Sequence, residues 1–441
     1  MKKLVNHHRG EAYDRCTPYV SRRSAEAVSS LECYLGGKFM VKSLRGLFLT
    51  LVFFSQPSLH AYADKTYGPG VTDTEIKIGQ TMPYSGPVSA YGTVGKAMAA
   101  YFAKVNDEGG INGRKLSLIS LDDGFSPPKT VEQTRKLVEQ ENVLLIFGSV
   151  GTPTNSAISK YLNAQRVPQL FVITGSPKLG DPKNFPWTMP LHYSFDQEAA
   201  IYAQYLLNNR PTAKIAILYQ NDDYGRTLTA AFKRTLGENA LSMVVAEASY
   251  ELTDPTVDQQ IISLQASGAD TLVDFSTTKA AAQTIRKAYD IGWHPLHIIP
   301  FPASSVAVTL RAAGLEKSVG LISATFMKDV NDPRWAADPG VRDYRAWFKK
   351  YYPEGDVNDE RNIQAYITAQ AMVHVLQQCG NDLSRENVMR QATRLSGVPL
   401  PMLFSGIKLN TNPTEYFPIK QLQPVRFDGS RWVPFGDLMG K

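Results

Sequence analysis

The chain has 441 residues, with 47 Lys and Arg against 41 Asp and Glu and a formal net charge of +6. Residues 1–63 hold nine of these basic and four of these acidic side chains, which leaves 38 basic and 37 acidic residues in 64–441. This near-neutral remainder has no electrostatic basis for binding nucleic acid. Its length exceeds what one hydrophobic core usually supports, so two domains are expected.

Residues 40–63 have the pattern of a secretory signal peptide, because two basic residues precede the apolar run 47–54 and an Ala-x-Ala sequence closes the segment. The run is too short to span a bilayer, which needs roughly 20 residues. We expect cleavage between Ala63 and Asp64. Residues 1–39 resemble neither a domain nor a targeting device, and we expect a mis-assigned or disordered extension there.

After this cleavage a single cysteine remains, so no intramolecular disulfide is expected. Cys379 ends an apolar helical segment directly before Gly380. This position is typical of a small buried hydrophobic side chain and gives little support to a catalytic thiol.

Residues 76–116 contain a strand, a polar loop, a helix and a turn in direct succession. Ile76 and Ile78 alternate with a polar residue, and a cluster of Pro, Ser and Gly follows the strand. Apolar residues then recur from Val94 to Val105 with the spacing of one helix face, before two glycines end the helix. The stretch predicts a β-loop-α unit.

The same alternation continues along the chain. Ser126 followed by Pro127 is a typical helix start. Apolar runs separated by segments of helical length predict a parallel α/β architecture. The predicted strands are 115–121, 143–147, 169–173, 214–219, 241–247, 271–275 and 297–299.

Loops at the carboxyl ends of parallel strands meet at one edge of a sheet, where ligands contact helix N-termini and free backbone N–H groups. Loop 148–156 follows one predicted strand and is rich in Gly, Ser and Thr, and loop 174–176 follows the next. Such residues let the backbone approach an anion, but they are also common in plain turns. Both interpretations stay open from these residues alone.

The order of these elements and the motifs SGPVSAYG, GGINGR, NDDYG and FDG resemble the branched-chain-amino-acid-binding family of periplasmic proteins across residues 72–441. The resemblance implies an α/β fold of the type I periplasmic binding proteins, with two doubly wound lobes joined by a three-segment hinge. We expect lobe 1 to contain 64–190 and 325–400, and lobe 2 to contain 191–324 and 401–441.

The same resemblance implies a cradle for a ligand carboxylate in the first lobe. Thr174, Gly175 and Ser176 match the segment that holds the carboxylate with hydroxyls and main-chain amides. Gly151 or Thr152 takes the place of a serine that contacts the carboxylate. A contact through the backbone is expected at this position.

Two tyrosines match family residues that close over the ligand from opposite lobes. They are Tyr91, in SAYG, and Tyr224, in NDDYG. For each, packing against its own helix is the alternative.

The chain departs from the family at the acidic residue that pairs with a ligand ammonium. This segment here reads PFPASS, with Phe301, and the neighbouring loop reads FSTTKAAA, with Phe275 and Thr277. A buried ammonium without a partner is strongly unfavourable. We therefore predict a carboxylate without an amino group and with an apolar or aromatic body, against Phe301. The alternative, that another acid supplies the charge, has three candidates: Asp222, Asp223 and Asp274.

These features predict a periplasmic substrate-binding protein of an ABC importer, acting as a monomer with a membrane permease and ATPase subunits. Branched-chain or other amino acids are the alternative ligands. A ligand-sensing regulator on the same fold is a second class, although a secretory leader argues against it. Residues 64–441 contain no recognised catalytic, nucleotide-binding or zinc-binding motif, so neither an enzyme nor a cofactor is expected.

Overall fold

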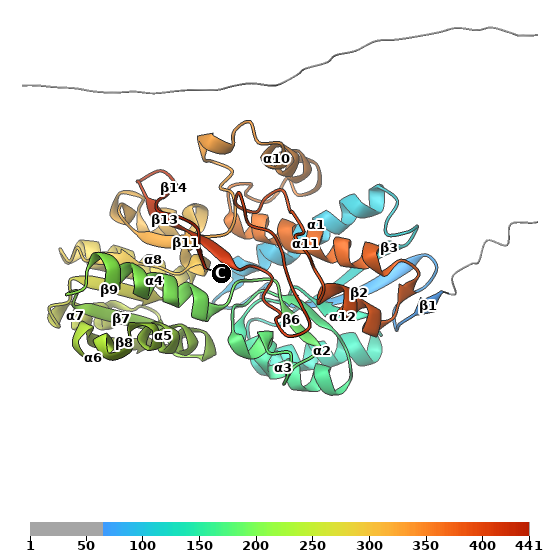
Figure 1. The fold of residues 1–441 in the computed structure, drawn as a ribbon, viewed down its shortest axis with the longest axis horizontal. Helices are drawn as coiled ribbons and strands as arrows, with labels where there is room; N and C mark the ends of the chain where they lie inside the picture. The colour runs from blue at the N-terminus through green and yellow to red at the C-terminus, as the bar shows by residue number, and fades with distance from the viewer. Residues whose placement is uncertain (1–64, 441) are drawn as a thin grey trace, which may run out of the picture. The chain divides into compact units, whose positions relative to one another are not determined.

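The computed structural model describes residues 65–440 (Figure 1). The predicted extension 1–39, the signal segment 40–63 and the cleavage site between Ala63 and Asp64 therefore lie outside the described residues. Residues 65–440 belong to one compact unit.

The strands are β1 (Thr66–Tyr67), β2 (Glu75–Met82), β3 (Lys115–Asp122), β4 (Leu145–Phe147), β5 (Gln169–Val172), β6 (Thr188–Pro190), β7 (Ile215–Gln220), β8 (Val244–Tyr250), β9 (Thr271–Phe275), β10 (Leu296–Ile298), β11 (Ile322–Thr325), β12 (Asp382–Leu383), β13 (Gln421–Phe427), β14 (Trp432–Pro434) and β15 (Met439–Gly440). The α-helices are α1 (Gly92–Asp107), α2 (Pro127–Arg135), α3 (Thr152–Ala164), α4 (Phe195–Asn209), α5 (Asp223–Leu236), α6 (Ala240–Met243), α7 (Asp258–Ala266), α8 (Thr278–Asp290), α9 (Arg311–Ala313), α10 (Pro339–Tyr351), α11 (Glu360–Cys379) and α12 (Arg385–Ala392). Two short 3-10 helices near the site are η1 (Ser89–Tyr91) and η5 (Phe301–Ala303).

The first large sheet is parallel throughout, with the spatial order β3-β2-β4-β5-β6. Its first strand along the chain, β2, lies between the second and the third. The direction of winding therefore reverses between β2 and β4, and in such sheets ligands bind outside the carboxyl ends of the strands at this reversal.

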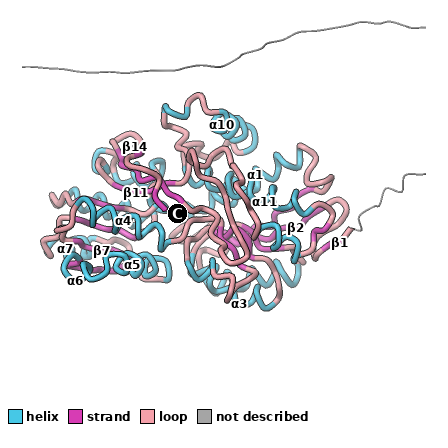
Figure 2. Tube along the Cα trace, in the orientation of Figure 1, coloured by secondary structure: helices cyan, strands magenta, loops and turns pink. Residues whose placement is uncertain are grey.

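The second large sheet repeats this order in its parallel part, β8-β7-β9-β10-β11, and continues antiparallel through β13 to β14. The reversal here lies between β7 and β9. Figure 2 shows the two groups of strands as separate magenta layers with helices around each. Each sheet thus brings one pair of loops to a crevice of its own.

The chain passes between the two sheets three times. It leaves β6 of the first sheet and, through α4, enters β7 of the second. After β11 it returns to α11, which packs on α1 beside the first sheet. Finally β13 re-enters the second sheet, next to β11.

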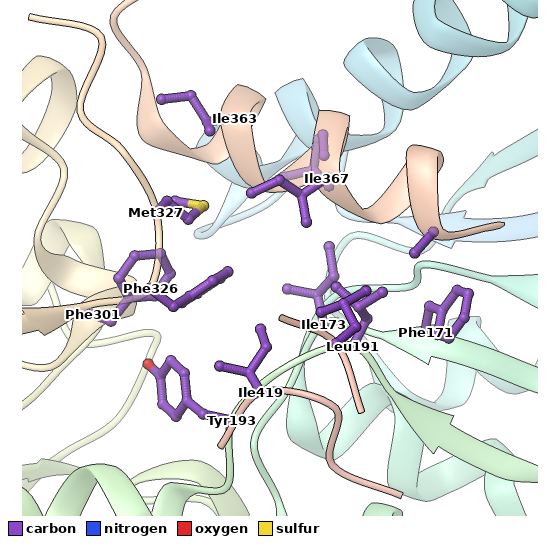
Figure 3. Close-up of a cluster of buried hydrophobic side chains, with 14 of the residues drawn as sticks. Phe171, Ile173, Leu191, Tyr193, Phe301, Phe326, Met327, Ile363, Ile367 and Ile419 are labelled. Atoms are coloured by element: carbon purple, nitrogen blue, oxygen red, sulfur yellow. The ribbon is translucent and has the colours of Figure 1, made fainter. Parts of the chain in front are cut away.

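One apolar cluster contains buried residues attached to both sheets. Figure 3 shows Phe301, Phe326 and Tyr193 on one side and Ile173 and Leu191 opposite them. The rings of Phe301 and Phe326 lie 5.0 Å apart between centroids. This cluster lies where the chain segments cross, and it gives the crossing region an apolar core.

Most predicted elements are confirmed, but segment 241–247 was assigned wrongly at its start. Residues 241–243 belong to α6, and β8 begins only at Val244. Leu241 is 93% exposed, because this short helix lies outside the sheet. The apolar residues Leu241 and Met243 were here no sign of a buried strand.

Cys379 is buried at the end of α11, as predicted for a small hydrophobic side chain. Burial raises the pKa of its thiol to about 12. Within residues 65–440 no helix combines the length and the apolar character that a membrane crossing requires.

Candidate ligand-binding site

A cavity with an empty volume of about 730 Å³ lies at the carboxyl ends of the strands of both sheets. Its lining comes from the loops after β2, β4, β7 and β9, which flank the two reversal points, and also from the loops after β3, β5, β6 and β10 and from the start of α11. The cavity therefore occupies the place that the winding of the sheets predicts for a ligand.

One end of the cavity is suited to an anion. Gly151 precedes α3 with φ of 104°, a conformation that favours glycine. The Phe125 ring occupies the space that a side chain at this position would need. The hydroxyl oxygens of Thr152 and Thr174 lie 2.7 Å apart, both side chains being buried. The N-terminus of α3, with its free N–H groups and partial positive charge, thus faces the cavity.

Tyr91 connects the elements around the two sheets. It ends η1 after β2, and its hydroxyl donates a hydrogen bond of 2.7 Å to the carbonyl oxygen of Pro302, after β10. The Thr278 hydroxyl, at the start of α8, donates a hydrogen bond of 3.2 Å to the hydroxyl oxygen of Tyr91. Burial raises the pKa of Tyr91, so the phenol stays protonated and is able to donate.

On the opposite side, Tyr224 is 6% exposed, and its ring lies 5.3 Å from that of Phe195. Gln220 accepts hydrogen bonds from the hydroxyls of Thr277, at 2.9 Å, and Tyr250, at 3.1 Å. Asp222 in turn accepts from the amide nitrogens of Tyr224 and Gln220. These bonds fix the polar side chains of this wall before any ligand arrives.

A buried carboxyl group supports the loop that carries Phe301. Glu198, on α4, accepts hydrogen bonds from the Phe301 backbone N–H at 2.7 Å and from the Tyr202 hydroxyl at 2.9 Å. Its side chain is fully buried, and burial raises its pKa to about 7. The position of Phe301 against the cavity therefore depends on a side chain that does not itself line it.

Two ionisable residues at the start of α11 line the cavity and were not predicted from the sequence. Arg361 forms two short hydrogen bonds with Asp359, of 2.9 and 2.6 Å, and its guanidinium lies 5.3 Å from the centre of the Tyr91 ring. Glu360 accepts from the Ser305 hydroxyl at 2.7 Å and from the Val306 N–H at 3.1 Å. Burial raises the pKa of Glu360 to about 8.

His192, Phe125 and Gln220 also line the cavity without having been predicted. Gln220 ends β7, and the other two lie in the loops within three residues of the ends of β6 and β3. The rule that ligands meet the carboxyl ends of strands would have pointed to these positions, whereas no motif marks them.

Of the ten residues predicted for ligand binding, seven line the cavity: Tyr91, Gly151, Thr152, Thr174, Tyr224, Thr277 and Phe301. The structure brings these together from both sheets, but it contains no ligand, so their role in binding stays a prediction.

Gly175, Ser176 and Phe275 do not belong to the cavity lining. Gly175 packs against Phe195 and the Tyr193 carbonyl, which leave no room for a side chain. Ser176 is buried behind Thr174, whose hydroxyl accepts a bond from its N–H. Phe275 points into the core of the second sheet, where its ring lies 5.9 Å from that of Phe232.

The three aspartates considered as replacement acids are also absent from the lining. Asp222 caps the N-terminus of α5. Asp274 lies within β9, fully buried and 3.6 Å from His297. Asp223 is exposed at the start of α5.

Comparison with known proteins agrees with this architecture. The family model described as "Periplasmic binding protein" matches residues 75–416. The chain therefore belongs to the branched-chain-amino-acid-binding family of type I periplasmic binding proteins, which are solute-binding proteins that work with ABC transporter permeases.

Among curated relatives, the Leu/Ile/Val-binding protein homolog 7 of Brucella abortus (strain 2308) is 24% identical over 300 residues, which cover 65% of this chain and 73% of the relative. Among solved structures, a branched chain amino acid ABC transporter protein from Thermus thermophilus with bound valine has a TM-score of 0.76 at 16% identity, covering 84% of this chain and 98% of the other. The fatty acid ABC transporter substrate-binding protein from Thermomonospora curvata has a TM-score of 0.72 at 21% identity, covering 86% and 95%.

Proposed function

We propose that this protein captures a small carboxylate without an amino group, and with an apolar or aromatic body, and delivers it to the membrane permease of an ABC importer. It acts in the periplasm as a monomer, and the ligand is enclosed between the two lobes. The observation that carries this proposal is the cavity itself, which combines an anion-suited end with apolar walls and offers no free acidic group.

The carboxylate is assigned to the N-terminus of α3. The first turn of α3, which begins at Thr152, has backbone N–H groups without an intrahelical partner, and the hydroxyls of Thr152 and Thr174 are close enough to act together. Helix N-termini favour negative charge. The ligands named for the relatives, branched-chain amino acids and a fatty acid, all carry a carboxylate.

The lack of an amino group is inferred from the acidic residues. Glu360 is the one carboxyl group among the described lining residues. Both its oxygens already accept hydrogen bonds from the protein. With a pKa of about 8 it is mostly uncharged at pH 7. An ammonium group would therefore be buried without a negative partner, which is strongly unfavourable.

The apolar walls suit a hydrocarbon or aromatic body. They come from the loops of both lobes and consist of Val88, Phe125, Val150, Ile173, Phe195, Phe301 and Pro302. Enclosure between these walls requires the lobes to close, and a ligand favours closure only if it contacts both of them. The bond between Tyr91 and Pro302 fits a closed arrangement.

A thermal-shift screen of residues 64–441 tests the proposal, because a ligand that binds the folded state raises the melting temperature by mass action. One panel contains aliphatic amino acids and the other contains aromatic and aliphatic carboxylates without amino groups. We expect shifts with carboxylates only. A shift with leucine, isoleucine or valine, and none with the second panel, would contradict the proposal.

Replacing Phe301 by alanine is expected to weaken binding of an aromatic carboxylate by roughly tenfold to a hundredfold, because the ring forms part of the apolar wall. Titration calorimetry measures the affinity. Phe435→Ala is the control, since this ring packs on Tyr205 away from the cavity. Unchanged affinity in the Phe301 variant would contradict the placement of the ligand body.

Amino-acid binding is the second candidate function, and the presence of Glu360 in the lining is the observation that favours it. A ligand ammonium next to this carboxyl group would lower its pKa and pair with it. In that case Glu360→Gln would abolish leucine binding. If the first proposal holds, the wild-type protein itself does not bind leucine.

A further inference from the structure

His192 lines the cavity from the loop after β6, two residues beyond the end of the strand. Its side chain is 2% exposed. Aromatic rings surround it, with centroid distances of 4.0 Å to Tyr193, 5.8 Å to Phe195 and 6.2 Å to Phe301. This is a polar side chain held in an apolar part of the cavity, and the arrangement of its hydrogen bonds limits what a ligand can place there.

One ring nitrogen of His192 is already occupied. Nδ1 lies 2.9 Å from the carbonyl oxygen of Tyr193. A carbonyl oxygen only accepts hydrogen bonds, so Nδ1 carries the proton. Burial lowers the pKa of His192 to about 4, so the ring is neutral at pH 7. The other nitrogen, Nε2, is then an acceptor. No hydrogen bond to it is found within residues 65–440, and it is not among the fully buried unpaired atoms, so it keeps an accessible surface at the cavity.

A ligand that fills the cavity displaces the water around this acceptor. A buried acceptor without a donor weakens binding by roughly tenfold or more. A carboxylate cannot satisfy Nε2, because it only accepts. An ammonium would bring a positive charge into a cavity whose one carboxyl group among the described lining residues, Glu360, is mostly uncharged. A neutral hydroxyl donates one hydrogen bond without adding charge.

We propose that the ligand is a hydroxylated carboxylic acid whose hydroxyl donates a hydrogen bond to Nε2 of His192. This inference rests on the proposed function and narrows its ligand class. His192 then selects between acids that differ by one hydroxyl, while the N-terminus of α3 binds the carboxylate that they share.

Titration calorimetry of the full-length protein with two pairs of acids tests this inference: benzoate with 4-hydroxybenzoate, and 3-phenylpropanoate with 2-hydroxy-3-phenylpropanoate. In at least one pair we expect the hydroxylated acid to bind tenfold or more tightly than its partner. His192→Phe removes the acceptor and should reduce this ratio to less than about threefold. His192→Gln keeps an acceptor near the position of Nε2 and should retain part of the ratio.

The outcomes separate the two proposals. If the acids bind but the hydroxylated members have no advantage, or if the advantage survives in His192→Phe, the role of His192 is wrong and the carboxylate function stands. If no acid of either pair binds and no carboxylate raises the melting temperature in the thermal-shift screen, both proposals are overturned. A thermal melt would show whether His192→Phe folds. If it does not, equal affinities for the two acids of each pair in the wild-type protein would contradict the role of His192. Complete loss of the preference for the hydroxylated acid in His192→Gln would contradict it as well.

Discussion

Replacing Arg361 by leucine is expected to destabilise the protein by about 3–5 kcal/mol, the usual cost of leaving one member of a buried ion pair without its partner. Asp359 is 4% exposed and would lose both bonds from the guanidinium. The Tyr91 ring would lose the cation above it, which weakens the wall of the cavity as well. Urea unfolding, followed by circular dichroism, measures the change in the free energy of unfolding.

Two further variants make this prediction specific. Arg361→Lys keeps the charge but not the bidentate geometry, so its loss of unfolding free energy should be smaller than that of the leucine variant. Adding Asp359→Asn to Arg361→Leu removes the stranded charge, and asparagine still caps the start of α11. The double variant should therefore recover part of the loss. A loss below about 1 kcal/mol in Arg361→Leu would mean that water solvates Asp359.

Replacing Glu198 by glutamine is expected to remove a pH dependence of stability. The pKa of Glu198 is about 7 in the folded protein against 4.5 in the unfolded chain. Below pH 4.5 the group is protonated in both states, and between pH 4.5 and 7 the folded state binds more protons. Its contribution to stability therefore falls as the pH rises through this window, by about 3 kcal/mol in total. Above pH 7 it is constant.

His192 has the opposite effect in an overlapping window, so the difference between variant and wild type is the quantity to measure. Its pKa of about 4, lowered by burial from 6.5, makes stability rise with pH between these values. Relative to wild type, Glu198→Gln should gain about 3 kcal/mol between pH 4.5 and 8. Glu238→Gln, at an exposed position, is the control. If the free energy of unfolding of Glu198→Gln and of the wild type changed with pH in parallel, the burial of this carboxyl group would be contradicted.

The sequence predicted the fold well because alternation of strands and helices is a local signal. Strand β9 was predicted with its exact bounds, 271–275, and β3 to within one residue. The start of β8 was missed because Leu241 is apolar, as a buried strand residue would be, although it lies exposed in a short helix. Hydrophobicity indicates burial only where the neighbouring residues confirm the period.

The cavity was predicted less completely, for two physical reasons. Residues that follow a strand in a recognisable motif, such as Tyr91 and Thr152, could be placed, but the direction of a side chain within a loop could not. Ser176 and Phe275 thus turned out to face the core. Glu360 and Arg361 come from a helix far along the chain that only the return crossing brings to the cavity, and no local pattern reveals such a contact.

Cys379 has a practical consequence. Within residues 64–441 it is the single cysteine, it is buried, and with a pKa of about 12 it is held as the unreactive thiol at neutral pH. A cysteine introduced at an exposed position such as Ser89, beside Tyr91, would therefore be labelled selectively by a maleimide dye. A protein of residues 64–441 needs no prior removal of thiols to become a fluorescent sensor that reports its own ligand.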